Sequence, residues 1–452
     1  MPIKIAQNKS VSQNTTIIIY CRQKSSRLEY AACLLFEKIL TIPYEITQDT
    51  SVYSAFDGLK INYSSQEILS NEVWISPHPL IFETGIHTLK INFTLVNDLK
   101  AAFFTQKVNA TLPFDPFALT FFLASRYEEY NRPGTHYDIH NRFISKYSYA
   151  AQFDFIDQPL INQWAIELKR LLQERFPASH FPEKKYSYQP TYDIDIAWAY
   201  KNRSLVRHLV SGGKQLLSGQ LKHFLHRLKV IQGVQNDPFD TYAFLDELHK
   251  KYKLHPQYFF LLAKRGKYDK AISPQNPQLQ SLIKQMSELH EVDIHPSYAS
   301  HKSTNTLKAE IELLQSITNK PIHKSRQHFL KLEFPTTYQN LIQMGIQKDY
   351  SMGYADQIGF RASLASPFPW YDLPSESITS LIIHPFQVMD ATLKNYMKIP
   401  AEKVVATVLP LINAVRKVDG TFTTLWHNSS FSYIDGWEKY QPIYEKIIEA
   451  AI

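Results

Sequence analysis

Glycine and cysteine are scarce in this chain of 452 residues. The 13 glycines are about 3% of the sequence against a usual share of roughly 7%, so a fold built on many glycine-rich phosphate loops is not expected. Cys21 and Cys33 are too few for a disulfide framework or a four-thiolate metal site. No GxGxxG, GxSxG or CxxC motif occurs, and Gln215 follows Gly212–Lys214 where a phosphate-binding loop requires Ser or Thr.

Long apolar segments are missing as well. The longest apolar runs, such as Thr15–Tyr20, have the length of a strand, whereas a membrane-spanning helix needs about 18 apolar residues or more. Residues 1–16 contain no apolar core of a secretory signal peptide. Together with the low cysteine content, these absences predict a protein of the reducing cytoplasm.

The remaining composition is that of an ordinary globular protein, with 44% hydrophobic and 20% charged residues. At about 150 residues per domain, the length predicts two or three domains. The net charge of +7 permits an anionic partner but does not require one. The 27 tyrosines and 27 phenylalanines can fill a large core or line a cleft for a sugar or another organic ligand.

Two regions of the chain differ in pattern. Residues 15–90 alternate strand-like and helix-like segments. The polar segment at 181–190 is bracketed by prolines and predicts a domain boundary. We therefore expect a mixed α/β N-terminal domain of unknown role at residues 1–185 and a second domain at residues 186–452.

The second domain alternates seven short apolar segments with amphipathic helices. The strand candidates are residues 186–195, 257–263, 291–297, 323–332, 346–352, 378–389 and 421–428. Strands that alternate with helices are typical of parallel βαβ units. The predicted fold is therefore a distorted seven-stranded parallel β/α barrel, whose active site would lie at the carboxyl ends of the strands.

Ionisable residues lie at the predicted carboxyl ends of these strands. They are Asp193, Asp195, His295, Arg326, His328, Asp349, His384 and His427. Two carboxylates and several imidazoles suit a divalent-metal hydrolase, in which one carboxylate takes a proton from water and a histidine protonates the leaving group. Alternatively, each is a separate structural residue, such as an aspartate that caps a helix.

Five segments at these strand ends resemble the motifs of the polysaccharide deacetylases, metal-dependent carbohydrate esterases with a distorted β/α barrel. The segments are Thr191-Tyr192-Asp193-Ile194-Asp195, HPSYASH from His295, Arg326-Gln327-His328-Phe329, Asp349 in KDYS, and Leu425-Trp426-His427. The likeness covers residues 186–452. The segment FDPF…SRYEEY at 114–130 also resembles the helper region that precedes such domains in Bacteroidetes proteins.

The resemblance implies an activity, the removal of an acetyl group from an N-acetylated or O-acetylated sugar of a polysaccharide or glycan precursor. Asp193 would be the general base, oriented by Arg326. His427 would be the general acid, ordered by Asp349. Three aromatic residues could stack on the sugar or could pack in the core: Trp426, Trp370 and Tyr354.

The resemblance also implies a divalent metal, zinc by preference, with Asp195 and His295 as ligands. Ala299 stands where the family has a second histidine. His328 could supply the third ligand, His301 could do so from a loop, or the site could lack a third protein ligand. In the last case the rival function gains, namely a catalytically weak or inactive barrel that binds a glycan.

A basic stretch without acidic residues extends from Ile196 to Asn236. Leucines and cations alternate at helical spacing over residues 203–229, which indicates one or two amphipathic helices. These helices could lie on an anionic membrane or bind a lipid-linked glycan, or they could pack on the barrel with a basic outer face. No nucleic-acid-binding signature accompanies the charge, so we do not expect a nucleic acid as partner. The partner that the resemblance implies is a carbohydrate substrate.

Overall fold

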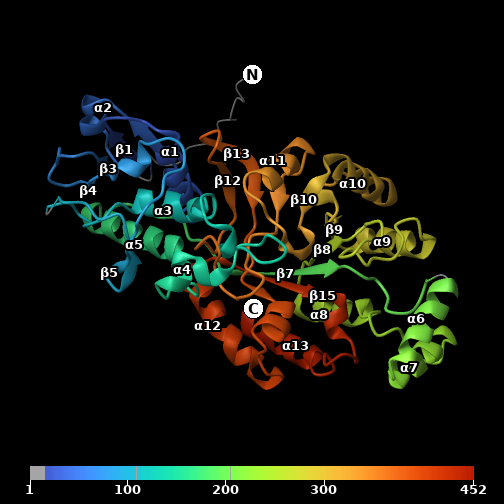
Figure 1. Ribbon diagram of the computed structural model, residues 1–452. Coiled ribbons are helices and arrows are strands. Elements are labelled where there is room, and N and C mark those ends of the chain that lie inside the picture. The colour runs from blue at the N-terminus through green and yellow to red at the C-terminus, as the bar shows by residue number, and fades with distance from the viewer. Residues whose placement is uncertain (1–15, 108, 204) are drawn as a thin grey trace. The chain divides into compact units, whose positions relative to one another are not determined.

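The computed structural model of the chain describes residues 16–107, 109–203 and 205–452 (Figure 1). The prediction about a signal peptide falls on residues 1–15, which lie outside that description. None of the described helices combines the length and the apolar character needed to cross a membrane. The chain forms two compact units. The first comprises the residues up to Asn131, Pro159–Lys185 and Tyr371–Thr379, and the second comprises Arg132–Gln158, Tyr186–Trp370 and Ser380–Ile452.

A four-stranded parallel sheet in the order β2-β1-β3-β4 organises the first unit. Its strands are β1 (Ile17–Cys21), β2 (Tyr44–Thr47), β3 (Leu59–Tyr63) and β4 (Val73–Ile75). Its helices are α1 (Ser26–Ala32), the π-helix η2 (Cys33–Ile39), α2 (Thr50–Ala55), α3 (Pro116–Ala124) and α5 (Leu160–Arg175). Every residue of β1 and β3 is buried, as expected for parallel strands covered on both faces. An antiparallel pair, β5 (Thr94–Val96) and β6 (Leu99–Ala101), lies apart from this sheet.

A buried aspartate ties α3 to this sheet. The Asp115 carboxylate accepts hydrogen bonds from the backbone N–H groups of Phe117 and Ala118, which begin the helix. It also accepts from the Tyr63 hydroxyl of β3 at 2.5 Å and from the His78 backbone N–H at 2.7 Å. Burial raises the pKa of Asp115 to about 6, although its hydrogen bonds oppose the shift.

Replacing Asp115 with alanine is expected to lower the free energy of unfolding by about 3 kcal/mol, because four donors lose their buried acceptor. Urea unfolding of the full chain measures the change. Asp49→Ala is the matched control, since Asp49 caps α2 through two similar bonds but is exposed. The control is expected to cost about 1 kcal/mol, and equal losses in the two variants would contradict the account given for Asp115.

A nine-stranded sheet in the order β12-β13-β11-β10-β9-β8-β7-β15-β14 has most of its residues in the second unit. The strands are β7 (Ser187–Ile194), β8 (Gln257–Phe260), β9 (Glu291–Ile294), β10 (Lys324–Ser325), β11 (Lys348–Asp349), β12 (Phe368–Asp372), β13 (Ser377–Ile383), β14 (Val388–Met389) and β15 (Thr421–His427). From β13 to β14 every neighbouring pair is parallel. The predicted mixed α/β fold with parallel sheets is therefore confirmed.

Helices alternate with these strands along the chain (Figure 1). They are α4 (Tyr149–Gln152), α6 (Leu205–Leu217), α7 (Leu221–Ile231), α8 (Tyr242–Tyr252), α9 (Pro277–Leu289), α10 (Thr304–Thr318), α11 (Thr336–Gln343), α12 (Val404–Arg416) and α13 (Tyr440–Ala451). The helices α8 to α10, α12 and α13 each bury one apolar face, as amphipathic helices on a sheet do.

The sheet differs from the expected closed seven-stranded barrel. The sixth predicted strand, 378–389, divides into β13 beside β11 and β14 beside β15, and the described residues show no strand pairing that closes the series. The change of partner occurs around Pro385, which has no N–H to donate. On one side of it, the His384 N–H donates to the Asp349 carbonyl oxygen, and on the other, the Gln387 N–H donates to that of Thr423.

The two compact units are not separated by a single boundary between residues 185 and 186. Residues Arg132–Gln158 precede that point but belong to the second unit, and Tyr371–Thr379 follow it but belong to the first. The division into domains 1–185 and 186–452 stays a prediction, and these two segments are its exceptions.

Candidate active site

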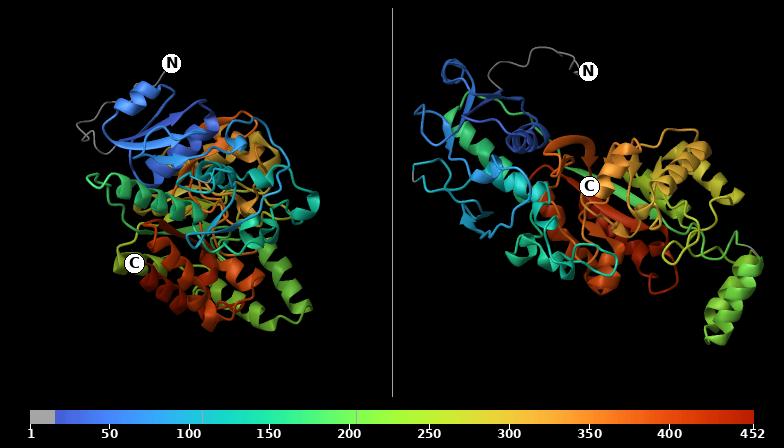
Figure 2. Two further views of the ribbon diagram at one scale, coloured as in Figure 1. Left: turned by 90° about the vertical axis from the view of Figure 1, so that its left-hand side faces the viewer. Right: turned by 45° about the horizontal axis from the view of Figure 1, so that its top comes forward.

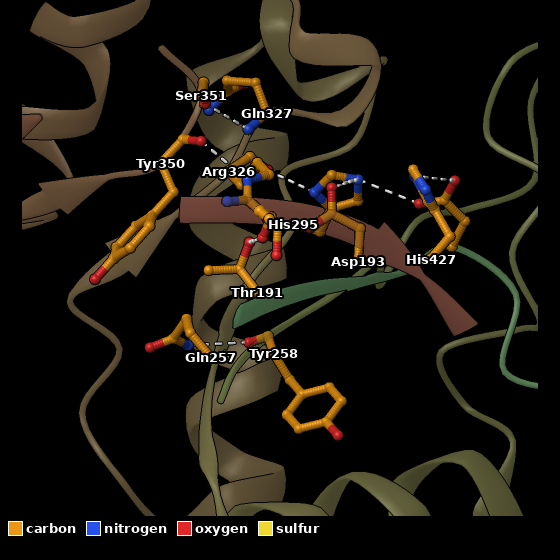
Figure 3. Close-up of polar contacts among 12 residues, drawn as sticks. Thr191, Asp193, Gln257, Tyr258, His295, Arg326, Gln327, Tyr350, Ser351 and His427 are labelled. Carbon is orange, nitrogen blue, oxygen red and sulfur yellow. Dashed lines mark hydrogen bonds and ion pairs between the residues drawn. The ribbon is translucent and has the colours of Figure 1, made fainter. Parts of the chain in front are cut away.

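Strand register places an aspartate beside a histidine at the carboxyl end of β7. Asp193 pairs with His427 of β15 on one side and with Phe259 of β8 on the other. His295 follows the last residue of β9, one strand further along the sheet. The side chains of Asp193, His295 and His427 consequently gather at this end of the sheet, together with Arg326 (Figure 3).

A fully buried arginine holds Asp193. Arg326 Nη1 donates to Asp193 Oδ1 at 3.0 Å, and Nε donates to the Tyr350 carbonyl oxygen at 2.9 Å (Figure 3). The guanidinium carbon also lies 4.8 Å from the centroid of the Phe259 ring. The second carboxylate oxygen, Asp193 Oδ2, lies 3.7 Å from His295 Nε2. Arg326 thus fixes one oxygen of Asp193 and leaves the other facing the histidines.

Asp195, His295 and His328 bring three potential ligand atoms within 4.8 Å of one another. Asp195 Oδ1 lies 3.2 Å from His295 Nε2, and Oδ2 lies 3.6 Å from His328 Nε2. Oδ1 is buried and has no hydrogen-bond partner. A buried carboxylate oxygen without a hydrogen-bond partner, beside an imidazole nitrogen, is an arrangement that a bound cation would satisfy.

Both imidazoles of this group are held through Nδ1. His295 Nδ1 lies 2.6 Å from the Arg326 carbonyl oxygen, and His328 Nδ1 lies 2.9 Å from Asp269 Oδ1. Since a carbonyl or carboxylate oxygen accepts, each Nδ1 donates, and each Nε2 is directed to Asp195. Such supporting hydrogen bonds orient histidine ligands in metal sites. One carboxylate and two imidazoles, with a fourth position open, are a donor set that fits a zinc-like divalent cation.

The charged side chains of this group shift one another's pKa values. Burial by itself lowers the pKa of His328, but the carboxylates of Asp195 and Asp269 more than offset this effect and raise the pKa to about 9. Burial disfavours the Asp195 carboxylate as well, yet the His328 and His295 imidazoles hold its pKa well below its usual value. A cation that binds here would displace the proton of His328.

Of the two histidines considered for the third ligand position, the structure brings His328 to Asp195 and His295. His301 Nε2 lies 3.0 Å from Glu333 Oε2 instead. Ala299 offers no ligand atom. The metal-binding role of the three gathered residues stays a prediction.

His427 has a carboxylate partner that the sequence did not predict. Asp390, fully buried, lies with Oδ1 2.9 Å from His427 Nδ1 and accepts from the His427 backbone N–H through Oδ2. Burial by itself lowers the pKa of His427, but Asp390 outweighs it and raises the pKa to about 10. The opposite ring nitrogen, Nε2, lies 3.9 Å from Asp195 Oδ2. His427 is therefore oriented with Nε2 toward the gathered carboxylates.

The predicted pairing of Asp349 with His427 is wrong. Asp349 accepts hydrogen bonds from the hydroxyls of Ser325 and Ser351, and burial raises its pKa to about 6. His384, taken as the polar end of the sixth strand, stacks on Tyr350 with ring centroids 4.4 Å apart. Asp390 is the polar residue that follows the second part of that divided strand, β14.

These residues open into one cavity of about 180 Å³. It is lined by Arg142, Asp193, Asp195, His295, Gln327, His328, Phe329, Leu330, Met389, Ala391, Tyr396, Leu425 and His427. Arg142 was not anticipated, because it lies in the segment before residue 186. Its Nη2 donates to the Tyr396 hydroxyl at 2.9 Å and its Nη1 donates to the Phe329 carbonyl oxygen at 3.2 Å.

The cavity wall includes strained backbone. Phe329 and Leu330 are consecutive residues with φ of +61° and +53°, a left-handed conformation that costs side-chain-bearing residues about 1–2 kcal/mol each. Surrounding contacts have to maintain such a conformation, and strain of this kind clusters at functional sites. The Arg142 hydrogen bond to the Phe329 carbonyl is one of these contacts.

The three aromatic residues considered for sugar stacking are not available for it. Trp426 is fully buried and packs on Phe431 and Tyr444, with ring centroids 5.3 and 4.6 Å away. Trp370 and Tyr354 are also buried, at 2% and 1% exposure. For all three residues, the core alternative is the one that the structure shows.

A second histidine–aspartate group lies at the opposite end of the strands. Asp246, His249 and His290 border a cavity of about 590 Å³ beside the amino ends of β8 and β9. His290 Nε2 lies 2.8 Å from Asp246 Oδ1, and His249 Nε2 lies 2.8 Å from the Tyr192 hydroxyl. We assign no chemistry to this group, because parallel β/α folds carry their active sites at the carboxyl ends.

Comparison with known proteins gives one family match and several structural likenesses. The model of a "Family of unknown function (DUF7033)" matches residues 17–177. No curated protein matches the chain. Among solved structures, a protein from Mycobacterium smegmatis, provisionally assigned as a polysaccharide deacetylase, is 14% identical over 60% of this chain and 86% of its own, with a TM-score of 0.36.

Two further likenesses are of the same kind. A polysaccharide deacetylase from Bacillus cereus is 11% identical over 59% of this chain and 87% of its own, with a TM-score of 0.30. A CE4 family pseudoenzyme from Bacillus anthracis is 10% identical over 59% of this chain and 61% of its own, with a TM-score of 0.28. At these TM-scores the likenesses do not assign a function, so the geometry of the site has to support one.

Proposed function

We propose that the second unit of this chain is a metal-dependent hydrolase that removes an acetyl group from an N-acetylated or O-acetylated sugar. One observation carries the proposal. The gathered group of Asp195, His295 and His328 lies in the same cavity as an arginine-held aspartate, Asp193, and an aspartate-held histidine, His427. A cation site flanked by a base and an acid is what hydrolysis of an amide or ester requires.

The metal centre would use Asp195, His295 and His328. A divalent ion there, zinc by preference, would supply Lewis-acid chemistry that polarises a carbonyl oxygen and makes water more acidic. His328 supports this assignment, because it lies with Asp195 and His295 and would replace the ligand that Ala299 cannot supply. The rival function, a barrel that only binds a glycan, depended on that gap.

Asp193 would take the proton from the attacking water. Because Arg326 occupies Oδ1, the proton would be received on Oδ2, which faces the histidines. The base is thereby fixed in position before substrate arrives.

His427 would deliver a proton to the departing sugar nitrogen or oxygen from Nε2. Asp390 holds the opposite nitrogen, which sets the tautomer and the direction of the ring. The neighbouring carboxylates keep the ring protonated at neutral pH, as a general acid must be.

The cavity fits an acyl group together with part of one sugar ring. Its volume of about 180 Å³ is smaller than the roughly 300 Å³ or more of pockets that enclose a whole drug-sized ligand. Leu330, Met389 and Leu425 offer an apolar wall for a methyl group, while Arg142 and Tyr396 offer donors for hydroxyls. The rest of a longer glycan would lie outside the cavity.

Acetate release tests the proposal. The full chain, loaded with zinc, is expected to release acetate from N-acetylglucosamine oligomers or from acetylated xylan, and removal of the metal by a chelator is expected to stop the release. Glycan binding by calorimetry without acetate release in either substrate would overturn the hydrolase and favour the binding module.

Asp390→Asn is expected to lower kcat roughly 10- to 100-fold, because the amide no longer stabilises a protonated His427. Removing the carboxylate lowers the pKa of His427. The alkaline limb of the pH profile should therefore move to lower pH, and kcat measured across pH checks this. Asp349→Asn is the matched control and should leave the profile unchanged while lowering stability. A shifted pH profile in Asp349→Asn, or an unshifted one in Asp390→Asn, would instead support the pairing of Asp349 with His427.

A further inference from the structure

The basic stretch singled out in the sequence forms a helical hairpin. Helices α6 and α7 are joined by residues 218–220 and lie side by side (Figure 2). Arg227 Nε of α7 donates to Gln215 Oε1 of α6 at 3.0 Å, and the Phe224 ring approaches Gly212. The connection turns at Gly219, whose φ of +70° suits glycine.

One face of α7 anchors the hairpin. Arg227 is buried, with its guanidinium carbon 4.8 Å from the centroid of the Tyr200 ring, and Val230 is 2% exposed. The His226 ring contacts Tyr433 with centroids 5.7 Å apart. The opposite face of α7 carries Leu221, Leu225 and Leu228, which recur at helical spacing.

The hairpin exposes an unusual amount of apolar surface. Among the residues that the structure describes, 19 large apolar side chains are exposed, and nine of them lie between Leu209 and Val234. Leu217 is 93% exposed and Leu209 is 77% exposed. Leu209 and Leu217 therefore do not pack against the rest of the unit. Exposed apolar side chains gathered on one segment indicate a surface that a lipid layer or another molecule covers.

The charge of the hairpin indicates that the partner that covers it is anionic. Lys214, Lys222 and Lys229 are exposed, and no acidic residue occurs between Ile196 and Asn236. At 100° per residue, Lys222 and Lys229 border the leucine stripe of α7. Leucines on one face with flanking lysines are typical of helices that lie in the headgroup region of an anionic bilayer.

We propose that the hairpin of α6 and α7 docks this protein on an anionic lipid surface. The leucines enter the boundary between headgroups and acyl chains, and the lysines contact the phosphates. The proposal is independent of the hydrolase assignment, because none of these residues lines the active-site cavity. It places the chain beside substrates that are attached to, or emerge from, a membrane.

Co-sedimentation of the full chain with vesicles tests the proposal. Binding is expected to vesicles of equal parts phosphatidylglycerol and phosphatidylcholine, and to be at least about tenfold weaker with phosphatidylcholine alone. Binding should weaken as salt rises, because charges are screened within about 10 Å at 0.1 M. Equal binding to both vesicles, or none to either, would overturn the proposal.

Two variants separate the apolar and the ionic contributions. Replacing Lys214, Lys222 and Lys229 with glutamine is expected to lower the partition coefficient roughly 100-fold, at about fivefold per lysine. Replacing Leu217 and Leu221 with serine should lower it at least about tenfold per leucine. The matched control combines Leu289→Ser with Lys308→Gln, an exposed pair outside the hairpin, and should bind as the parent does.

Two further measurements test whether a second copy of the chain, or a polyanion other than lipid, covers the hairpin. If the leucine variant changes the oligomeric state in sedimentation velocity but not vesicle binding, a second copy of the chain covers the patch and the proposal is overturned. If an oligonucleotide binds as tightly as the vesicles and the leucine variant retains both activities, the surface is a general polyanion site and the proposal also fails. Acetate release from a soluble oligosaccharide should be unchanged in every hairpin variant.

Discussion

Asp193→Asn is expected to reduce acetate release by about 100- to 10,000-fold, the usual contribution of a general base. The amide has the size of the carboxylate but cannot accept a proton from water at neutral pH. Asp195, His295 and His328 are untouched, so bound metal, measured by elemental analysis, should stay at the parent level. The loss should lie in kcat, with little change in KM.

The matched control is Asp293→Asn. Asp293 belongs to β9, is 4% exposed, and accepts from the backbone N–H groups of His323 and Lys324 outside the cavity. This variant should lose stability but keep its kcat. Near-parental turnover in Asp193→Asn with metal bound would remove Asp193 from the role of base.

His328→Ala is expected to lower metal affinity by at least about 100-fold, because it leaves a catalytic site with two protein ligands where three are usual. Competition with a chelating indicator measures the affinity without reference to turnover. His301→Ala is the matched control, since His301 contacts Glu333 and lies outside the gathered group. The control should bind metal as the parent does.

Asp269→Asn adds a graded test of the same site. Asp269 holds His328 Nδ1, and loss of such a supporting partner typically costs about 10- to 100-fold in metal affinity or activity. Its effect should therefore be smaller than that of His328→Ala. Metal loss in His301→Ala with retention in His328→Ala would reverse the ligand assignment.

The grouping of Asp193, His295 and Arg326 could be anticipated from the sequence. The carboxyl ends of parallel strands share one edge, so polar residues that follow successive strands have to meet there. That argument needs only the strand order along the chain. It therefore succeeded for the residues at the ends of β7, β9 and β10.

The partner of His427 could not be anticipated in the same way. The pattern of segment 378–389 predicts one strand, with His384 as its polar residue. Only the change of partners around Pro385 shows that the chain continues as β14, with Asp390 at its end. Proline in the segment was the available signal, because it cannot take part as a donor in a central strand.

Trp426 packs in the core, and does not stack on a sugar, for a simple physical reason. Successive residues of a strand face opposite sides of the sheet. Leu425 and His427 line the cavity, so Trp426 between them has to face the other side, where it packs on Tyr444 of α13. Once His427 is assigned to the site, alternation along β15 is sufficient by itself to exclude Trp426 from sugar stacking.

The place of Arg142 in the cavity wall could not be predicted from the sequence. It reaches the cavity from a segment about 50 residues before Asp193, and no periodic pattern marks it. Only three-dimensional packing shows that the segment Arg132–Gln158 belongs to the second unit.

That segment has a consequence for the modularity of the protein. Backbone and side-chain bonds tie it to later parts of its unit: Phe360 N–H donates to the Ile156 carbonyl oxygen, and Ser145 donates to Asp356. A chain cut between Lys185 and Tyr186 would lose these bonds and the Arg142 wall of the cavity. The second unit is thus not encoded by one continuous stretch of the chain. A recombinant that replaces the residues before Tyr186 with another domain would have to keep residues 132–158.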